Sequence, residues 1–92
     1  MEVREYKGVF IASGVTTEAC TLRVILSTAA GETSGSGSFE LPAAIVGLTD
    51  RGLVFRTEEG DELALVLRDI DHGQGVAWFL TEGCVPAGRK VA

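Results

Sequence analysis

The chain has 92 residues, a hydrophobic content of 46%, a charged content of 23% and a net charge of −5. This length predicts a single domain over residues 1–92, and the composition is that of a globular protein and not of a disordered one. The acidic charge argues against nucleic acid and against an anionic membrane surface as partners, because binding to both depends on Lys and Arg.

The apolar runs are far shorter than the roughly 20 residues that span a bilayer. The first ten residues, MEVREYKGVF, carry charges and lack the apolar centre of a signal peptide. We therefore expect a cytoplasmic protein. In that compartment Cys20 and Cys84 are expected to be free thiols, with a disulfide as the alternative. Their separation excludes a close-set metal-binding pair.

Residues 3–13 predict a first strand whose inward face is ambiguous. Two alternating sets compete for that face: Tyr6 with Phe10, or Val9 with Ile11. Gly8 is the expected position of a bulge or a bend, since glycine inside a strand often marks one.

Residues 19–28 alternate clearly and predict a second strand. Its inward residues are expected to be Leu22, Val24 and Leu26, while Ile25 is an apolar exception on the outer face. Residues 29–38 contain a turn and then a Gly/Ser stretch. They indicate a hairpin whose returning strand is weak until Phe39, and the register of residues 29–41 stays open.

Residues 42–48, PAAIVGL, fit either one helical turn or a short strand. We favour the strand, which would pair Gly47 with Phe55 after a turn at residues 49–52. An aromatic ring covering a strand glycine is a common arrangement.

Residues 53–82 predict three antiparallel strands and indicate the fold class. A three-residue loop at 58–60 with a left-handed Gly60 pairs Phe55 with Leu63, and it places Arg56 opposite Glu62. A two-residue turn at His72 and Gly73 continues this pattern into the third strand. The expected pairs after that turn are Asp69 with Val76, Leu67 with Trp78, and Leu65 with Leu80.

These registers divide the meander into two faces. The predicted core face carries Leu53, Phe55, Leu63, Leu65, Leu67, Val76, Trp78 and Leu80. The predicted outer face carries Val54, Arg56, Ala64, Val66, Arg68, Ala77 and Phe79. An exposed sheet face is usually polar, so this mixed outer face predicts a covering element or a second copy of the chain.

Residues 83–92 leave the sheet at Pro86 and either fray or add an edge strand. The predicted fold is all-β: a small antiparallel meander of six to seven strands that forms a barrel or a two-layer sandwich. The strand pattern resembles that of lipocalin-like and SH3-like barrels, which implies a fold and no function.

The first functional hypothesis is a non-catalytic domain that acts by self-association or by binding another protein. A homo-oligomer is predicted, with a dimer favoured. The interface candidates are Val46, Leu48, Val54, Arg56, Val66, Arg68, Ala77 and Phe79.

Two alternatives come from other classes of function. A small barrel that binds an apolar small molecule would place Trp78 in its pocket. An enzyme would use His72, the single histidine, as a base beside Asp69 or Asp71. The sequence lacks the spread of titratable residues that a catalytic site needs, so no catalytic residue is predicted.

Two acidic segments have the composition of calcium ligands. Residues 58–62 are expected to form a solvated hairpin tip. Residues 69–73 have the D-x-D-x-G pattern but lack the remaining ligands and the flanking helices of a calcium loop. Their carboxylates are expected to cap turn amides. The sequence therefore predicts no metal and no cofactor.

Overall fold

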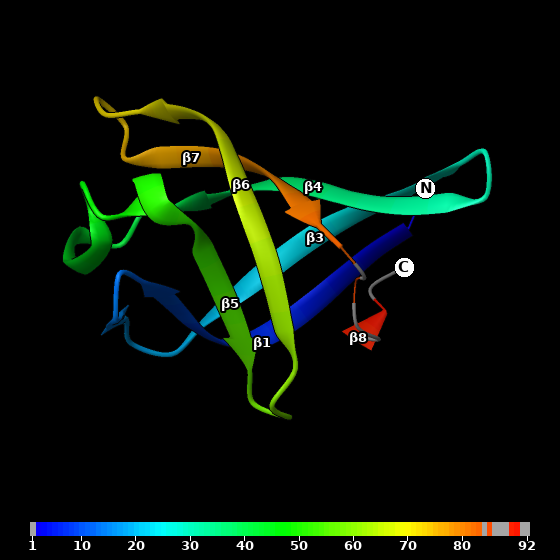
Figure 1. Ribbon diagram of the computed structural model, residues 1–92, viewed down its shortest axis with the longest axis horizontal. Coiled ribbons are helices and arrows are strands. Elements are labelled where there is room, and N and C mark those ends of the chain that lie inside the picture. Colours follow the sequence, from blue (N-terminus) through cyan, green and yellow to red (C-terminus); the bar gives the residue numbers. More distant parts are fainter. Residues whose placement is uncertain (1, 84, 86–88, 91–92) are drawn as a thin grey trace.

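The computed structural model describes residues 2–83, 85, 89 and 90. The chain is all-β and its strands are antiparallel (Figure 1). The strands are β1 (Glu2–Ala12), β2 (Val15–Thr16), β3 (Cys20–Ala29), β4 (Glu32–Glu40), β5 (Leu53–Thr57), β6 (Glu62–Asp71), β7 (Val76–Glu82) and β8 (Arg89–Lys90). Two short 3₁₀ helices, η1 (Ala43–Ile45) and η2 (Thr49–Arg51), join β4 to β5.

Six strands close into a barrel in the order β1, β3, β4, β7, β6, β5 and back to β1. β1 makes the closure because its first half pairs with β3 and its second half pairs with β5. Gly8 belongs to both ladders, opposite Cys20 on one side and Thr57 on the other. The short β2 and β8 pair with β1 outside this ring. The predicted all-β antiparallel fold is confirmed, and of the two alternatives, barrel or two-layer sandwich, the structure is the barrel.

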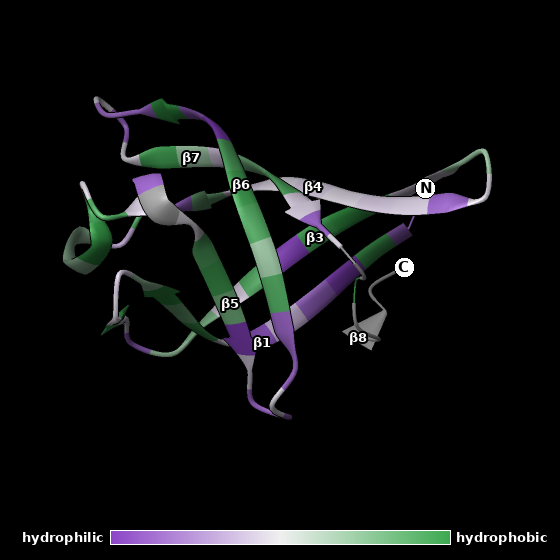
Figure 2. Ribbon diagram, in the orientation of Figure 1, coloured by the Kyte–Doolittle hydropathy of each residue, from purple (hydrophilic) through white to green (hydrophobic). Residues whose placement is uncertain are grey.

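The first strand faces inward with Tyr6, Phe10 and Ala12, which resolves the ambiguity of the sequence. β3 buries Leu22, Val24 and Leu26, as expected. β4 begins earlier than its composition indicates, at Glu32, directly after a tight turn. In that turn Ala30 and Gly31 both have positive φ, the conformation that a two-residue hairpin loop requires. Figure 2 shows β4 as mostly pale because it is rich in Ser and Gly.

The glycines of β4 are close to the core and make room for larger neighbours. A β-carbon built at Gly37 would lie 3.0 Å from Cζ of Phe79, and one at Gly35 would lie 2.5 Å from Cγ1 of Val24. The Gly/Ser stretch is therefore a strand whose missing side chains are replaced by those of β3 and β7. It is not a flexible linker.

The hairpin between β5 and β6 has the predicted register. Phe55 lies opposite Leu63 and Arg56 opposite Glu62, while the Thr57 amide donates to the Asp61 carbonyl over 2.8 Å. Gly60 has φ +94°, as the three-residue loop requires. The Arg56 guanidinium pairs with the Glu62 carboxylate on the exposed face at 2.9 Å.

The hairpin between β6 and β7 differs from the prediction. Its loop has four residues, 72–75, and the Gly75 amide donates to the Asp71 carbonyl over 2.7 Å. A bulge then lets Leu67 pair with Phe79 although Asp69 pairs with Trp78. Both changes alter the face of β7 that points inward. Ala77 and Phe79 are buried, whereas Trp78 and Leu80 are exposed.

The segment between β4 and β5 is not the predicted strand. Gly47 pairs with no strand in the described part of the chain, and Phe55 lies instead between Phe10 of β1 and Leu63 of β6. Closure of the barrel by β1 occupies the edge of β5 that the expected strand needed. η1 instead directs Ile45 into the core. At the other end of the chain, β8 confirms the edge-strand alternative for residues 89–90, whereas Cys84 and Pro86 lie outside the described residues.

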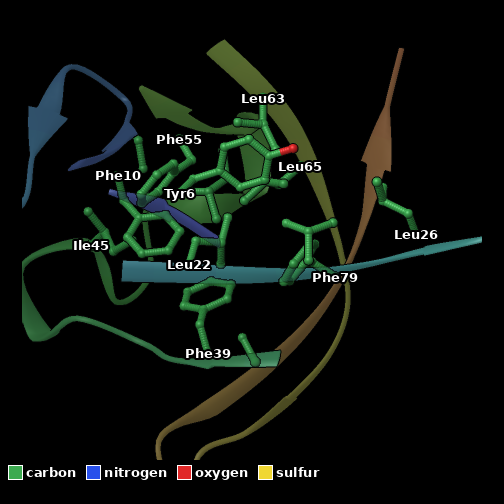
Figure 3. Packing of buried hydrophobic residues seen from close by; sticks show 14 residues of the cluster. Tyr6, Phe10, Leu22, Leu26, Phe39, Ile45, Phe55, Leu63, Leu65 and Phe79 are labelled. Carbon is green, nitrogen blue, oxygen red and sulfur yellow. The ribbon is translucent and has the colours of Figure 1, made fainter. Parts of the chain in front are cut away.

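The core fills the barrel with side chains (Figure 3). Its buried members are Tyr6, Phe10, Ala12, Leu22, Val24, Leu26, Phe39, Ile45, Leu53, Phe55, Leu63, Leu65, Ala77 and Phe79. The Phe10 ring stacks on Phe39 with centroids 4.5 Å apart and meets Phe55 edge-on at 4.9 Å. A six-stranded barrel is narrow enough for such side chains to fill it.

Candidate functional site

The outer surface of the barrel carries a row of side chains across four strands, in which exposed apolar residues on β3, β7 and β6 align through a serine on β4. Ile25 on β3 lies opposite Ser36 on β4, Ser36 lies opposite Leu80 on β7, and Leu80 lies opposite Val66 on β6. Trp78 projects from β7 on the same face, two residues from Leu80. We call Ile25, Ser36, Leu80, Val66 and Trp78 the outer row.

The outer row is accessible to solvent in the single chain. Ile25 is 37% exposed, Leu80 38%, Trp78 42% and Val66 45%. Side chains directly opposite each other on neighbouring strands have β-carbons about 5 Å apart, so these residues form one patch and not scattered points. A contiguous apolar patch of this kind is typical of a protein-protein interface.

Charged residues flank the row on both sides. Glu82 continues the outward face of β7 opposite Ala64, and Arg68 stands at the bulge of β6 near Trp78. Both are exposed. Among the described residues, no salt bridge involves Arg68 or Glu82. The two charges at opposite ends of the patch are therefore available to a second molecule.

The structure separates the interface candidates of the sequence into three groups. Arg56, Val66 and Arg68 are exposed on the outer face as expected, and Val54 is half-buried there. Val46 is 52% exposed and Leu48 half-buried, but both lie in the connection between β4 and β5, away from the sheet. Ala77 and Phe79 are in the core of their own chain, so their assignment to the outer face was wrong.

Sequence reasoning missed Ile25 and Leu80 as partners in one patch. Ile25 was visible as an apolar exception on an outward position. Its alignment with Leu80 depends on the β3–β4 and β4–β7 registers, which no local pattern reveals. Trp78 was expected inside the barrel and lies outside it. The interior position beside Gly37 and Phe39 is taken by Phe79, so Trp78 lines no internal pocket.

His72 lies at the turn between β6 and β7 and is exposed. It borders an open groove of about 670 Å³ along β6, together with Asp50, Arg68 and Asp69. The Asp71 carboxylate accepts hydrogen bonds from the amides of Gly73 at 3.0 Å and Gln74 at 3.2 Å. This is the turn-capping role expected for it.

The acidic hairpin tips and Cys20 do not form a metal-binding cluster among the described residues. Within residues 2–83, 85, 89 and 90, no three His, Cys, Asp or Glu side chains gather closely enough to hold a metal ion. Cys20 is a free, half-buried thiol, and burial raises its pKa. The question of a disulfide to Cys84 lies outside the described residues.

A second feature of the surface is a groove in the barrel wall between β3 and β4. It has a volume of about 1000 Å³ and is lined by residues of both strands, of the segment before β3 and of η1. Phe10, Cys20 and Phe39 contribute apolar surface to it.

No helix in the described part of the chain has the length and apolar character needed to cross a membrane. The chain matches no protein-family model, no curated protein and no solved structure with which it was compared.

Proposed function

We propose that this protein is a non-catalytic β domain that functions as a homodimer, joined face to face through the outer row. The observation that supports this function best is the alignment of Ile25, Leu80 and Val66, each more than a third exposed, on β3, β7 and β6, with Ser36 of β4 between Ile25 and Leu80. Sheets that pack face to face bury such rows against each other at a separation of about 10 Å.

Self-association is favoured over binding of an unrelated partner because a twofold axis between two copies of the chain would bring complementary charges together. If the axis runs along the row, each strand of one protomer lies over the same strand of the other with its direction reversed. The end of β7 that carries Glu82 then lies over the end of the partner that carries its bulge. This arrangement brings Glu82 near Arg68 of the partner subunit, and the symmetry repeats the pair on the other side. The same surface thereby supplies both the apolar centre and complementary charges.

The first experiment is sedimentation equilibrium of the chain and its variants at micromolar concentration. The parent is expected to have twice the mass of the chain. Leu80→Lys places a charge at the centre of the row and should give the monomer mass. Val46→Lys is the matched control, because Val46 is a more exposed apolar residue outside the row, and this variant should remain dimeric. A monomeric parent would refute the proposal.

A charge exchange tests the symmetry of the dimer. Glu82→Arg and Arg68→Glu should each weaken dimerisation by placing like charges together, and the double variant should recover the parent affinity. Recovery in the double variant cannot come from general destabilisation of the fold. If the double variant is weaker than both single variants, the proposed axis is wrong.

A further inference from the structure

The wall of the barrel between β3 and β4 is joined at only one end. The ladder runs from Ala29 opposite Glu32 to Ile25 opposite Ser36, and no described pair continues it. Residues 20–24 of β3 therefore have β1 on one side, and residues 37–40 of β4 have β7 on one side. Figure 1 shows the two strands diverging from their hairpin toward η1. We call the groove of about 1000 Å³ between these unpaired segments the window.

The floor of the window is apolar. It consists of the stacked rings of Phe10 and Phe39, whose centroids are 4.5 Å apart, and of Cys20 and Leu41. The Cys20 thiol is uncharged near neutral pH because burial raises its pKa. A ligand side chain that enters the window therefore meets apolar surface and no charge at its base.

The backbone at the edges of the window has the orientation of a sheet edge. A two-residue hairpin loop makes Ala29 and Glu32 a hydrogen-bonded pair, and in an antiparallel ladder every second residue directs its N–H and C=O to the same neighbour. Continued along β3, this alternation points the backbone groups of Thr21 into the window, whereas the Arg23 carbonyl lies close to Gly37 of β4. Continued along β4, it points those of Ser38 and Glu40 into the window from the other side.

The rim of the window is acidic. Glu5, Glu18 and Glu40 line it together with a single cation, Arg23. Arg23 is already engaged, because its Nε lies 3.3 Å from Oε2 of Glu5. Among the described residues, no salt bridge involves Glu18 or Glu40, and both are exposed. The wide end of the window thus carries two carboxylates that lack a cationic partner in the described chain.

We propose that the window binds an extended, basic segment of another protein, which adds as a strand along the free edge of β3. Its backbone would pair with Thr21, alternate apolar side chains would enter the floor beside Phe39, and the intervening Lys or Arg side chains would reach Glu18 and Glu40. A second copy of this chain is a poor occupant, because its net charge is −5. The window adjoins the outer row, because Ser38, which lines the window, lies opposite Trp78. Binding in the window goes beyond the function proposed for the outer row.

The probe is a short synthetic peptide of alternating lysine and valine. Binding is followed by amide shifts in two-dimensional NMR, and shifts are expected in residues 20–23 and 38–41. Alkylation of Cys20, followed by mass spectrometry of its tryptic fragment, should slow when the peptide is present. A peptide of alternating glutamate and valine should not bind. The lysine peptide with N-methyl groups on its strand-pairing amides should lose binding, because it keeps the charge but cannot form the ladder.

Two double variants of the protein distinguish a specific effect of the rim carboxylates from an effect of the overall negative charge. The double variant Glu18→Gln with Glu40→Gln should weaken binding by about five- to tenfold, the effect of losing two exposed ion pairs. The control double variant Glu58→Gln with Glu59→Gln makes the same charge change at the β5–β6 turn and should bind like the parent. Equal losses in both double variants, or equal binding of the N-methylated peptide, would overturn the proposal. The monomeric Leu80→Lys chain should still bind the peptide, so failure of the dimer and failure of the window are distinguishable.

Discussion

The α-carbon of Gly8 lies against the backbone carbonyl of Arg56, so closely that a β-carbon at position 8 would stand 1.9 Å from that oxygen. This contact marks the residue at which β1 leaves β3 and joins β5. The pairing of β1 with β5 that closes the barrel therefore begins at a residue that has no room for a side chain. The sequence predicts a bulge or a bend at Gly8, and the structure shows a change of pairing partner at this residue.

Gly8→Ala is accordingly expected to destabilise the fold severely. The obstructing atom belongs to the backbone, so the β1–β5 ladder itself must move, and overpacking of this kind costs about 3 kcal/mol. Urea unfolding measures the loss. Gly73→Ala is the matched control, because its new β-carbon would meet only the Asp71 side chain at 3.3 Å. That variant should stay within about 1 kcal/mol of the parent, and equal losses in both variants would contradict the closure argument.

Gly60→Val should destabilise through backbone strain alone. Gly60 has φ +94°, and apart from Gly60 itself and its two chain neighbours no residue has an atom within 4 Å of the position its β-carbon would take. The expected loss in free energy of unfolding is about 1–2 kcal/mol, since β-branched residues are disfavoured at positive φ. Gly60→Asn should lose less, because asparagine tolerates this conformation better. If valine and asparagine have the same effect, strain is not the cause.

The β5–β6 hairpin could be predicted from the sequence because local information determines it. Its three-residue loop ends in glycine, and both flanking strands alternate, so only one register buries Phe55 with Leu63. The second hairpin has no such agreement. Gly73 and Gly75 can each serve as the turn glycine, so the sequence does not decide between the predicted loop and the observed loop of four residues. The bulge beside Arg68 has no signal in the sequence.

The face of β7 was decided by partners that are distant in the chain. Val76, Trp78 and Leu80 alternate as well as Ala77 and Phe79 do, and they are the larger set. Ala77 and Phe79 point inward because Gly37 on β4 has no side chain and leaves space for one ring, which the Phe79 ring occupies. For the same reason the sequence could place only Val66 and Ile25 of the outer row on an outward face. The alignment of these two residues needs the registers of three strand pairs.

Phe79→Ala and Trp78→Ala test this assignment directly. Phe79 is 1% exposed, and truncating a buried ring typically costs about 3–5 kcal/mol, whereas Trp78 is 42% exposed and should cost about 1 kcal/mol or less. Chemical unfolding should be measured at a dilution that gives the monomer mass, so that the outer row does not contribute. A larger loss for Trp78→Ala would mean that the other face of β7 is inside.

The final prediction concerns alkaline pH and Tyr6. Burial raises the pKa of the Tyr6 phenol above its ordinary value of 10.0, and the nearby Arg4 guanidinium only partly opposes this. The folded state therefore holds the phenol proton more tightly than the unfolded state does. The resulting stability is fully present below about pH 10 and is lost as pH rises through the folded-state pKa.

Tyr6→Phe removes the titrating group and keeps the ring in the core. The free energy of unfolding of the parent should fall more steeply above pH 10 than that of the variant, measured by urea unfolding at several pH values. At neutral pH the variant should be the less stable of the two, because it lacks the hydroxyl that hydrogen-bonds to Arg4. The two curves should thus converge as pH rises. Burial also raises the pKa of Cys20, but both proteins contain this thiol, so its contribution cancels in the comparison. Parallel curves across the alkaline range would contradict the buried position of the phenol.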